Sequence, residues 1–392
     1  MVHQIMKMKI NPAPRASSSS SVIRGCLRWW KLVAIVGTLV GCASVTADTP
    51  TPSDPVTAAP ADSRMQAKSR WVAVDWDDLP GFTQDNLFEA WNAWLKSCER
   101  PREPWIALCG DVRRLSIATD QAQRDWMRLQ LQPYRVEGLQ GASSGLLTGY
   151  YEPQLQASRI ATPQFQVPLY QTPLNWVAGQ AWYTRNEIDT LPQAQAALQG
   201  RAIAYLANPV DALVLQIQGS GRLHLTEPDG SVRLVRLAYA GTNDQPYRSV
   251  GRWLLDQGLI RDASWPGIKA WLATNPQREQ ELLWSNPRVV FFKEEAMTDF
   301  DAEFGPKGAQ GVALTPGRSI AVDPGSIPYG TPVWLTTAGP QLTVQRLVLA
   351  QDTGSAIVGA VRADYFAGWD GAAADLAGRL RQPLQMWVLW PK

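Results

Sequence analysis

The chain has 392 residues, which is enough for one large hydrophobic core or two ordinary ones. Its 37 basic and 35 acidic residues leave a net charge of +2, so the charge balance does not indicate binding to nucleic acid. It contains 18 tryptophans, and we expect most of them to fill the core and the others to serve as platforms for flat ligands such as sugar rings.

The start of the chain is predicted to be a secretory signal. Arg24, Arg28 and Lys31 precede the apolar stretch 32–40, which is too short to span a bilayer as a helix. This stretch runs into Leu39-Val40-Gly41-Cys42, which resembles a lipobox. We therefore expect residues 1–41 to be removed as a signal peptide.

Cleavage before Cys42 would leave a thiol for a lipid anchor, whereas an ordinary signal peptide would make this cysteine incidental. Residues 42–68 are rich in Pro, Ala, Thr, Ser and Asp and are predicted to form a flexible tether. One cysteine leaves with the signal peptide, so Cys98 and Cys109 remain as a pair in a compartment that permits disulfides. We predict that they are bonded.

Two helices are predicted next. The first begins with Thr83 as its N-cap and continues to about Ser97, and the second covers about Asp120–Leu131 and stops before Pro133. Along the first helix, a core-facing stripe recurs at helical spacing: Leu87, Trp91, Trp94, Leu95 and Cys98.

A β run closed by a turn is predicted at 146–153. From Gln154 onward, short apolar runs separated by Pro and Gly predict a mainly β structure, interrupted by three helices. The middle part is expected to form a small barrel or sandwich. The predicted strands are 212–218, 222–226 and 232–239 in this part, and 289–292, 320–322, 332–336, 342–350 and 385–389 after it. The predicted helices are 247–257, 265–273 and 277–284. We expect the last strands to close a barrel with the earlier chain and the middle region to be an insertion.

The candidate chemical centre is a set of aspartates in the last part. An apolar run ends in Asp352-Thr353-Gly354, Asp364 follows in Arg-Ala-Asp-Tyr-Phe, and Asp323 lies in a turn-rich loop. A strand that ends in a carboxylate holds this acid on a rigid support. An aspartate before a glycine is also a common turn former, so each of them has a structural interpretation as well.

The sequence gives little support for catalysis by histidine, by a metal ion or by a bound cofactor. The chain has two histidines, His3 in the predicted signal and His224 in an alternating, half-buried strand. No His/Cys cluster has the spacing of metal ligands, and neither phosphate-binding glycine motif is present, so we expect no metal or cofactor. Proton chemistry would therefore fall to Asp and Glu.

Several ordered motifs together resemble the membrane-bound lytic murein transglycosylase A family over nearly all of the chain that follows the signal. The motifs are residues 147–153, 216–221, 247–251, 321–324, 351–354 and 362–366, and the last three are similar to the three-aspartate domain of that family. Ser355 departs from the family pattern, which usually has a glycine there.

The resemblance implies a mainly β fold with flanking helices: a double-psi β-barrel, a second inserted β-barrel-like domain and a groove between them. It places the catalytic barrel at 69–155 with 298–392 and the insertion at 156–297. It also implies cleavage of the β-1,4 bond between N-acetylmuramic acid and N-acetylglucosamine in peptidoglycan. The muramoyl C6 hydroxyl would attack C1 without water and leave a 1,6-anhydro product.

By the same resemblance, Asp364 is the catalytic acid, and Asp352 and Asp323 support it. Candidate substrate-binding residues are Thr148, Gly149, Tyr150, Gln218, Gly219 and Ser220. A single acid is sufficient because the nucleophile belongs to the substrate. We expect burial, and Asp352 as a like charge, to raise the pKa of Asp364. The implied partners are peptidoglycan strands and the periplasmic face of the outer membrane, and partnership with cell-wall synthesis proteins is left open.

Three alternatives remain. A hydrolytic glycosidase would use Asp352 and Asp364 with a water molecule. An aspartic peptidase would need two aspartates that share a proton, but the chain has one Asp-Thr-Gly tripeptide. A binding module would hold glycan strands without cutting them.

Overall fold

A computed structural model describes residues 62–392. The predicted signal peptide, Cys42 and most of the tether lie outside this range. The tether was predicted to extend to residue 68, and this is wrong for its last residues. Strand β1 (Ser63–Met65) pairs with β2 (Arg70–Ala73), and the Lys68 ammonium group contacts Asp323 at 2.8 Å. Backbone pairing and an ion pair thus fix a segment whose composition alone suggested disorder.

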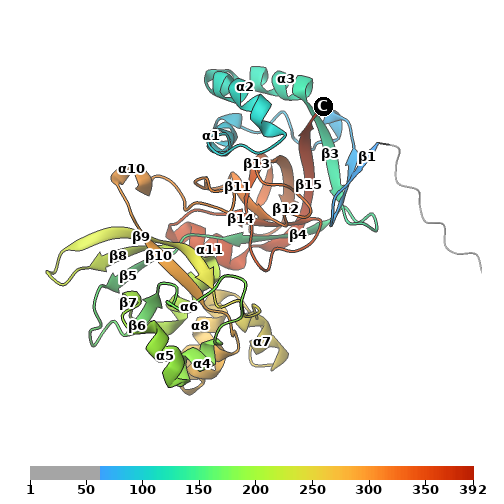
Figure 1. Cartoon of the computed structure of the whole chain (residues 1–392). Coiled ribbons are helices and arrows are strands. Elements are labelled where there is room, and N and C mark those ends of the chain that lie inside the picture. The colour runs from blue at the N-terminus through green and yellow to red at the C-terminus, as the bar shows by residue number, and fades with distance from the viewer. Residues whose placement is uncertain (1–61) are drawn as a thin grey trace, which may run out of the picture. The chain divides into compact units, whose positions relative to one another are not determined.

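A barrel is built into a nine-stranded sheet (Figure 1). Its ring closes because the last strand pairs with β12 through one half and with β4 through the other. Neighbours β4 and β14, and likewise β11 and β13, are parallel. The expected double-psi β-barrel is confirmed. In ring order the strands are β4 (Gly145–Tyr150), β14 (Arg362–Phe366), β11 (Ser319–Val322), β13 (Thr343–Asp352), β12 (Pro332–Ala338) and β15 (Arg381–Pro391). Strand β3 (Leu131–Glu137) connects β15 to β2.

Three helices carry much of the tryptophan core (Figure 1). They are α1 (Leu87–Ser97), α2 (Cys109–Arg114) and α3 (Asp120–Gln130). Helix α1 packs against β13, α3 against β3, and α2 against α1. The rings of Trp91 and Trp94 are 5.2 Å apart and both contact Trp126. A disulfide between Cys98 and Cys109 joins the end of α1 to the start of α2. The tryptophans here fill the core, as the sequence predicted.

The first helix starts later than predicted. Its N-cap is Asn86, whose side chain accepts a hydrogen bond from Phe88 N, and Thr83 lies outside the helix. Asp85, just before this cap, forms an ion pair with the buried Arg318, which directly precedes β11. The predicted core stripe is otherwise correct, with Trp91 and Trp94 each 1% exposed.

A second, six-stranded sheet has the order β10-β9-β8-β5-β7-β6 (Figure 1). Its strands are β5 (Gln154–Ser158), β6 (Val167–Tyr170), β7 (Ala202–Leu206), β8 (Gly221–Thr226), β9 (Val232–Thr242) and β10 (Val290–Ala296). The helices of this part are α4 (Arg185–Thr190), α5 (Pro192–Leu198), α6 (Pro209–Gln218), α7 (Val250–Asp256), α8 (Trp265–Thr274) and α9 (Glu279–Trp284). Two helices follow, α10 (Asp299–Ala302) and α11 (Gly371–Arg379).

The strand predicted at 212–218 is wrong, because these residues belong to helix α6. A continuous apolar run fits a buried strand or a buried helix equally well. The residues at its two ends show that this run is a helix. At the start, the Asn208 side chain accepts a hydrogen bond from Val210 N at 2.7 Å and Pro209 occupies the first turn. At the end, Gly219 adopts a φ of 82° as the C-cap. These are helix start and stop signals that outweigh the apparent alternation.

We predict that the Asp85–Arg318 pair is important for stability. Both side chains are buried, at 6% and 3% exposed, and two hydrogen bonds of 2.8 and 2.9 Å join them. Asp85→Ala should lower the free energy of unfolding by about 3–5 kcal/mol, because it leaves a buried guanidinium without its partner. Urea denaturation measures this change. Glu89→Ala is the matched control, since Glu89 is 60% exposed and contacts the same arginine. Its effect should stay below about 1 kcal/mol, and equal effects would contradict the prediction.

Candidate active site

Cross-strand register brings the predicted acids to one face of the barrel. Asp352 on β13 is opposite Ala321 on β11, and Ala321 is opposite Asp364 on β14. Asp364 is in turn opposite Thr148 on β4, which is opposite Arg381 on β15. Side chains of cross-strand partners project to the same side of a sheet. We call these five residues the site row.

Asp352 and Asp364 are two strand spacings apart, so their Cα atoms are separated by about 10 Å. The residue between them, Ala321, has the smallest side chain that a chiral residue can have. The space above it is therefore not filled from β11 itself, and both carboxyl groups can reach toward a ligand on this face.

Asp364 is half-buried, and one of its two carboxylate oxygens accepts a hydrogen bond. Thr148 Oγ1 donates to Asp364 Oδ1 at 2.5 Å, and Arg362 Nη2 donates to Thr148 Oγ1 at 2.8 Å. Arg362 thereby orients the threonine hydroxyl so that its proton points at the carboxylate. Within residues 62–392, no hydrogen bond is donated to Asp364 Oδ2. Burial raises the pKa of Asp364, while Thr148 and Arg362 oppose this rise.

Asp352 is engaged through both oxygens. Oδ1 accepts from the amides of Ala309 and Thr353, each at 2.9 Å, and Oδ2 accepts from the Tyr150 hydroxyl at 3.0 Å. Burial raises the pKa of Asp352 to about 6, these three donors oppose the rise, and the nearby Asp364 adds to it. The like-charge effect that we expected at Asp364 thus acts on Asp352. The neighbouring hydroxyl of Tyr150 also has a raised pKa, because it is buried and lies near both carboxylates.

Asp323 has a different environment. Its side chain accepts from Lys68 Nζ at 2.8 Å, Gly359 N at 2.9 Å and Gly325 N at 3.0 Å. Burial alone would raise the pKa of Asp323, but Lys68 and the two amides lower it overall. The carboxylate is charged and holds two loops beside the site row.

The remaining predicted residues are distributed over two elements. On β4, a Cβ atom at Gly149 would lie 2.8 Å from Ala377 Cα, so this glycine permits the close approach of α11. At the end of α6, Gln218 Oε1 accepts from Tyr151 N at 3.0 Å, Gly219 forms the C-cap, and Ser220 is buried. The structure thus brings Thr148 and Tyr150 to the two aspartates, and a single hydrogen bond connects Gln218 to the end of β4.

The sequence interpretation assigned no role to two charged groups close to this centre. Arg362 and Arg381 flank Asp364 and Thr148 on the same face. Strand alternation could have indicated Arg362, which is two residues before Asp364 on β14. Arg381 could not be recognised, because its position depends on which strand closes the ring.

A buried ion-pair cluster was also missed. Glu152 is fully buried and accepts from Arg222 Nε at 2.7 Å and from Arg236 Nε at 2.6 Å. Both arginines also donate to the Phe304 carbonyl oxygen, at 2.8 and 2.7 Å. Glu152 follows β4 and Phe304 follows β10, so this cluster ties together the two connections between the sheets. The Arg222 guanidinium group also lies 4.0 Å from the ring centre of Trp369.

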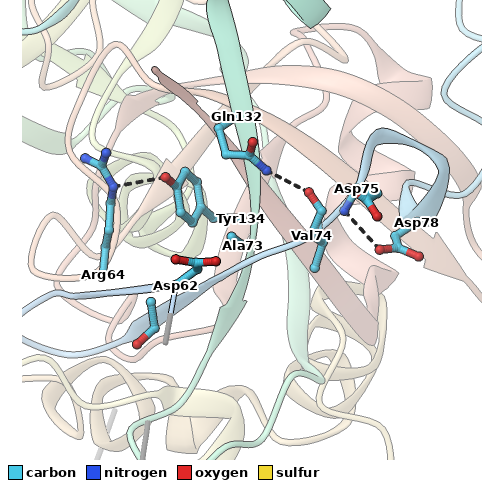
Figure 2. Close-up of a pocket in the computed structure, with 9 residues that line it drawn as sticks. Asp62, Arg64, Ala73, Val74, Asp75, Asp78, Gln132 and Tyr134 are labelled. Carbon is cyan, nitrogen blue, oxygen red and sulfur yellow. Dashed lines mark hydrogen bonds between the residues drawn. The ribbon is translucent and has the colours of Figure 1, made fainter. Parts of the chain in front are cut away.

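A pocket of about 730 Å³ lies elsewhere, at the edge formed by β1, β2 and β3 (Figure 2). Its polar groups include Asp62, Asp75 and Asp78, and Arg64 Nε donates to the Tyr134 hydroxyl at 3.1 Å. None of the predicted site residues lines it. The row around Asp364 combines two carboxyl groups of raised pKa with positioned donors, and this chemistry, not volume, identifies the candidate active site.

Comparisons with known proteins agree with this fold. The family model described as the MltA specific insert domain matches residues 146–293, and the 3D domain model matches residues 318–390. The membrane-bound lytic murein transglycosylase A of Escherichia coli (strain K12) is 31% identical over 300 residues, which cover 73% of this chain and 74% of that protein.

Solved structures are similar as well. The lytic transglycosylase LtgG of Burkholderia pseudomallei is 41% identical, covering 85% of this chain and 98% of that chain with a TM-score of 0.57. The E. coli MltA structure with bound chitohexaose is 25% identical, covering 85% and 95% with a TM-score of 0.63. The fold and the site define an enzyme of the lytic transglycosylase class. The chain belongs to the membrane-bound lytic murein transglycosylase A family.

The environment of Asp352 makes a testable prediction. The Tyr150 hydroxyl stabilises the charged form of this carboxyl, so Tyr150→Phe should raise the pKa of Asp352 above about 6. A ¹³C NMR titration of the labelled side-chain carboxyl measures the midpoint. Tyr170→Phe, on β6, is the control and should leave the midpoint unchanged. A midpoint that stays constant or falls in the Tyr150 variant would contradict the assignment.

Proposed function

We propose that the protein cleaves the β-1,4 bond between N-acetylmuramic acid and N-acetylglucosamine in peptidoglycan, and that Asp364 is its single acid and base. The observation that carries the proposal is the difference between the two carboxyl groups. Asp364 Oδ2 accepts no hydrogen bond from residues 62–392, whereas both oxygens of Asp352 accept hydrogen bonds. A group that must give up and recover a proton needs an oxygen open to the substrate.

The steps follow from this geometry. The Asp364 carboxyl gives its proton to the glycosidic oxygen as the bond from that oxygen to muramoyl C1 breaks. The muramoyl C6 hydroxyl oxygen then bonds to C1, and its proton passes to the Asp364 carboxylate. The acid is regenerated, no water is consumed, and the products are a 1,6-anhydromuramoyl end and a free sugar hydroxyl. An exposed aspartate would be protonated in only about one molecule in a thousand at pH 7, so the raised pKa of Asp364 supports this role.

The other site residues receive supporting roles in this proposal. Asp352 and Tyr150 form a fixed pair beside the acid, and Asp323 holds the adjacent loops. We assign glycan contacts to Thr148, Gly149 and Tyr150 on β4, and to Gln218, Gly219 and Ser220 after α6. The catalytic domain would comprise residues 69–155 and 298–392, and the glycan would bind in a groove between it and the insertion at 156–297.

We further propose that Cys42 carries a lipid anchor at the periplasmic face of the outer membrane. This residue lies outside the described part of the chain. Within residues 62–392, no helix is both long and apolar enough to pass through a bilayer. Relatives are named membrane-bound, and this name supports an anchor that precedes the folded region.

Substitution of the acid tests the proposal. Asp364→Asn keeps the size of the side chain but removes the transferable proton, so release of soluble muropeptides from purified murein should fall at least about 100-fold. Asp352→Asn should retain more activity, because its role is support. Asp375→Asn, on the exposed face of α11, is the matched control and should behave as the unmodified protein does. More than a few per cent of activity in the Asp364 variant would reject the assignment.

A further inference from the structure

Two positive charges at the end of the site row form no ion pair within residues 62–392. Arg381 is directly opposite Thr148, and Arg362 lies on the same face two residues before Asp364. Within residues 62–392, neither guanidinium group has a carboxylate oxygen within the 4.0 Å that defines an ion pair. The charge of Asp364 raises the pKa of Arg362, but the two side chains form no ion pair.

Arg362 is held firmly in place despite its charge. Nη2 donates to Thr148 at 2.8 Å, and Nη1 donates to the carbonyl oxygens of Ala363 at 2.5 Å and Leu146 at 3.4 Å. Burial lowers the pKa of Arg362, the charge of Asp364 raises it, and the neighbouring Arg381 lowers it again. The half-buried Arg362 and the exposed Arg381 therefore place two like charges close together.

The excess of positive charge becomes larger when Asp364 is protonated, which is the form that would donate the proton. When Asp364 is protonated to act as the acid, the negative charge nearest to the two arginines disappears. Arg381 then presents a planar, exposed fork of N–H donors that matches the geometry of a carboxylate, and Arg362, already bonded to Thr148 and two carbonyl oxygens, contributes its positive charge. A carboxylate on the substrate would supply the missing charge.

We propose that Arg362 and Arg381 bind a carboxylate carried by the muramoyl residue at the bond that is cut. This inference rests on the proposed function. Arg381 is two strand spacings, about 10 Å, from Asp364, and the muramoyl lactyl group belongs to the sugar on which Asp364 would act. The carboxylate is either the free lactyl group of a strand without peptide or a carboxylate of the stem peptide. Neutral glycan would lack this contact, so the pair would favour charged muramoyl strands.

Three matched substrates test the proposal. The first is glycan without stem peptides, which has free lactyl carboxylates; the second is the same glycan with these groups converted to methylamides. The third is uncross-linked glycan that retains its peptides. The value of kcat/KM is measured for each substrate from the release of 1,6-anhydro products, with the unmodified protein, Arg381→Gln and Arg379→Gln. Arg379 is the charge-matched control, because it is exposed on α11 and paired with Asp375.

The unmodified protein should prefer one carboxylate-bearing substrate over the methylamide by about tenfold, and Arg381→Gln should abolish this preference. Preference for the first substrate would identify the lactyl group, and preference for the third would identify the peptide. Arg379→Gln should keep the preference. Equal rates on all three substrates, or a uniform loss in Arg381→Gln, would overturn this inference alone. Absence of 1,6-anhydro products from the unmodified protein would instead overturn the proposed function.

Discussion

The architecture of the site depends on the pairing of strand β15 with three other strands. Its C-terminal half pairs with β3, its central part pairs with β12, and its first residues turn to pair with β4. This closes the ring and fixes the register of β4 against β14. A slip of one residue would turn Thr148 to the opposite face and remove its bond to Asp364. The geometry of the candidate active site is thus a consequence of ring closure.

The electrostatics of Asp364, the proposed acid, are a balance of opposing effects. Burial alone favours a protonated Asp364, but a fully apolar pocket would give no control of its orientation. The Thr148 hydroxyl holds one carboxyl oxygen, and Arg362 fixes the direction of that hydroxyl. The group is positioned through one oxygen and leaves the other open. Asp352 lies on the same face, but both of its carboxylate oxygens accept hydrogen bonds, one of them from the Tyr150 hydroxyl. It therefore holds Tyr150 in a fixed position.

The sequence correctly predicted those features of the fold and site that depend on residues close together in the chain. The Asp-Thr-Gly turn after an apolar run, the tryptophan stripe of α1 and the C-terminal strands all depend on neighbours within a few residues, and the structure contains them. The strand prediction for residues 212–218 was wrong because their apolar residues fit both a strand and a helix, and only the caps at Asn208 and Gly219 distinguish the two. The predicted start of α1 was wrong because Asp85 pairs with a distant arginine, Arg318.

Features that join distant segments could not be foreseen. The Glu152 cluster combines residues from β8, β9 and the connection after β10, and no spacing in the chain relates them. The same holds for the site row, in which Asp352, Asp364 and Thr148 become neighbours only through strand order. Family motifs supplied these residues as candidates, and three-dimensional pairing supplied their relation to one another.

The central physical claim is that a substrate hydroxyl, not a water molecule, attacks the sugar while one aspartate moves the proton. Digestion of murein in water enriched in oxygen-18, followed by mass spectrometry of the muropeptides, addresses this claim directly. The account predicts 1,6-anhydromuramoyl ends, one water lighter than hydrolysis products, with no heavy oxygen incorporated. Reducing muramic acid ends that carry oxygen-18 would contradict it and would indicate a hydrolase that uses both Asp352 and Asp364.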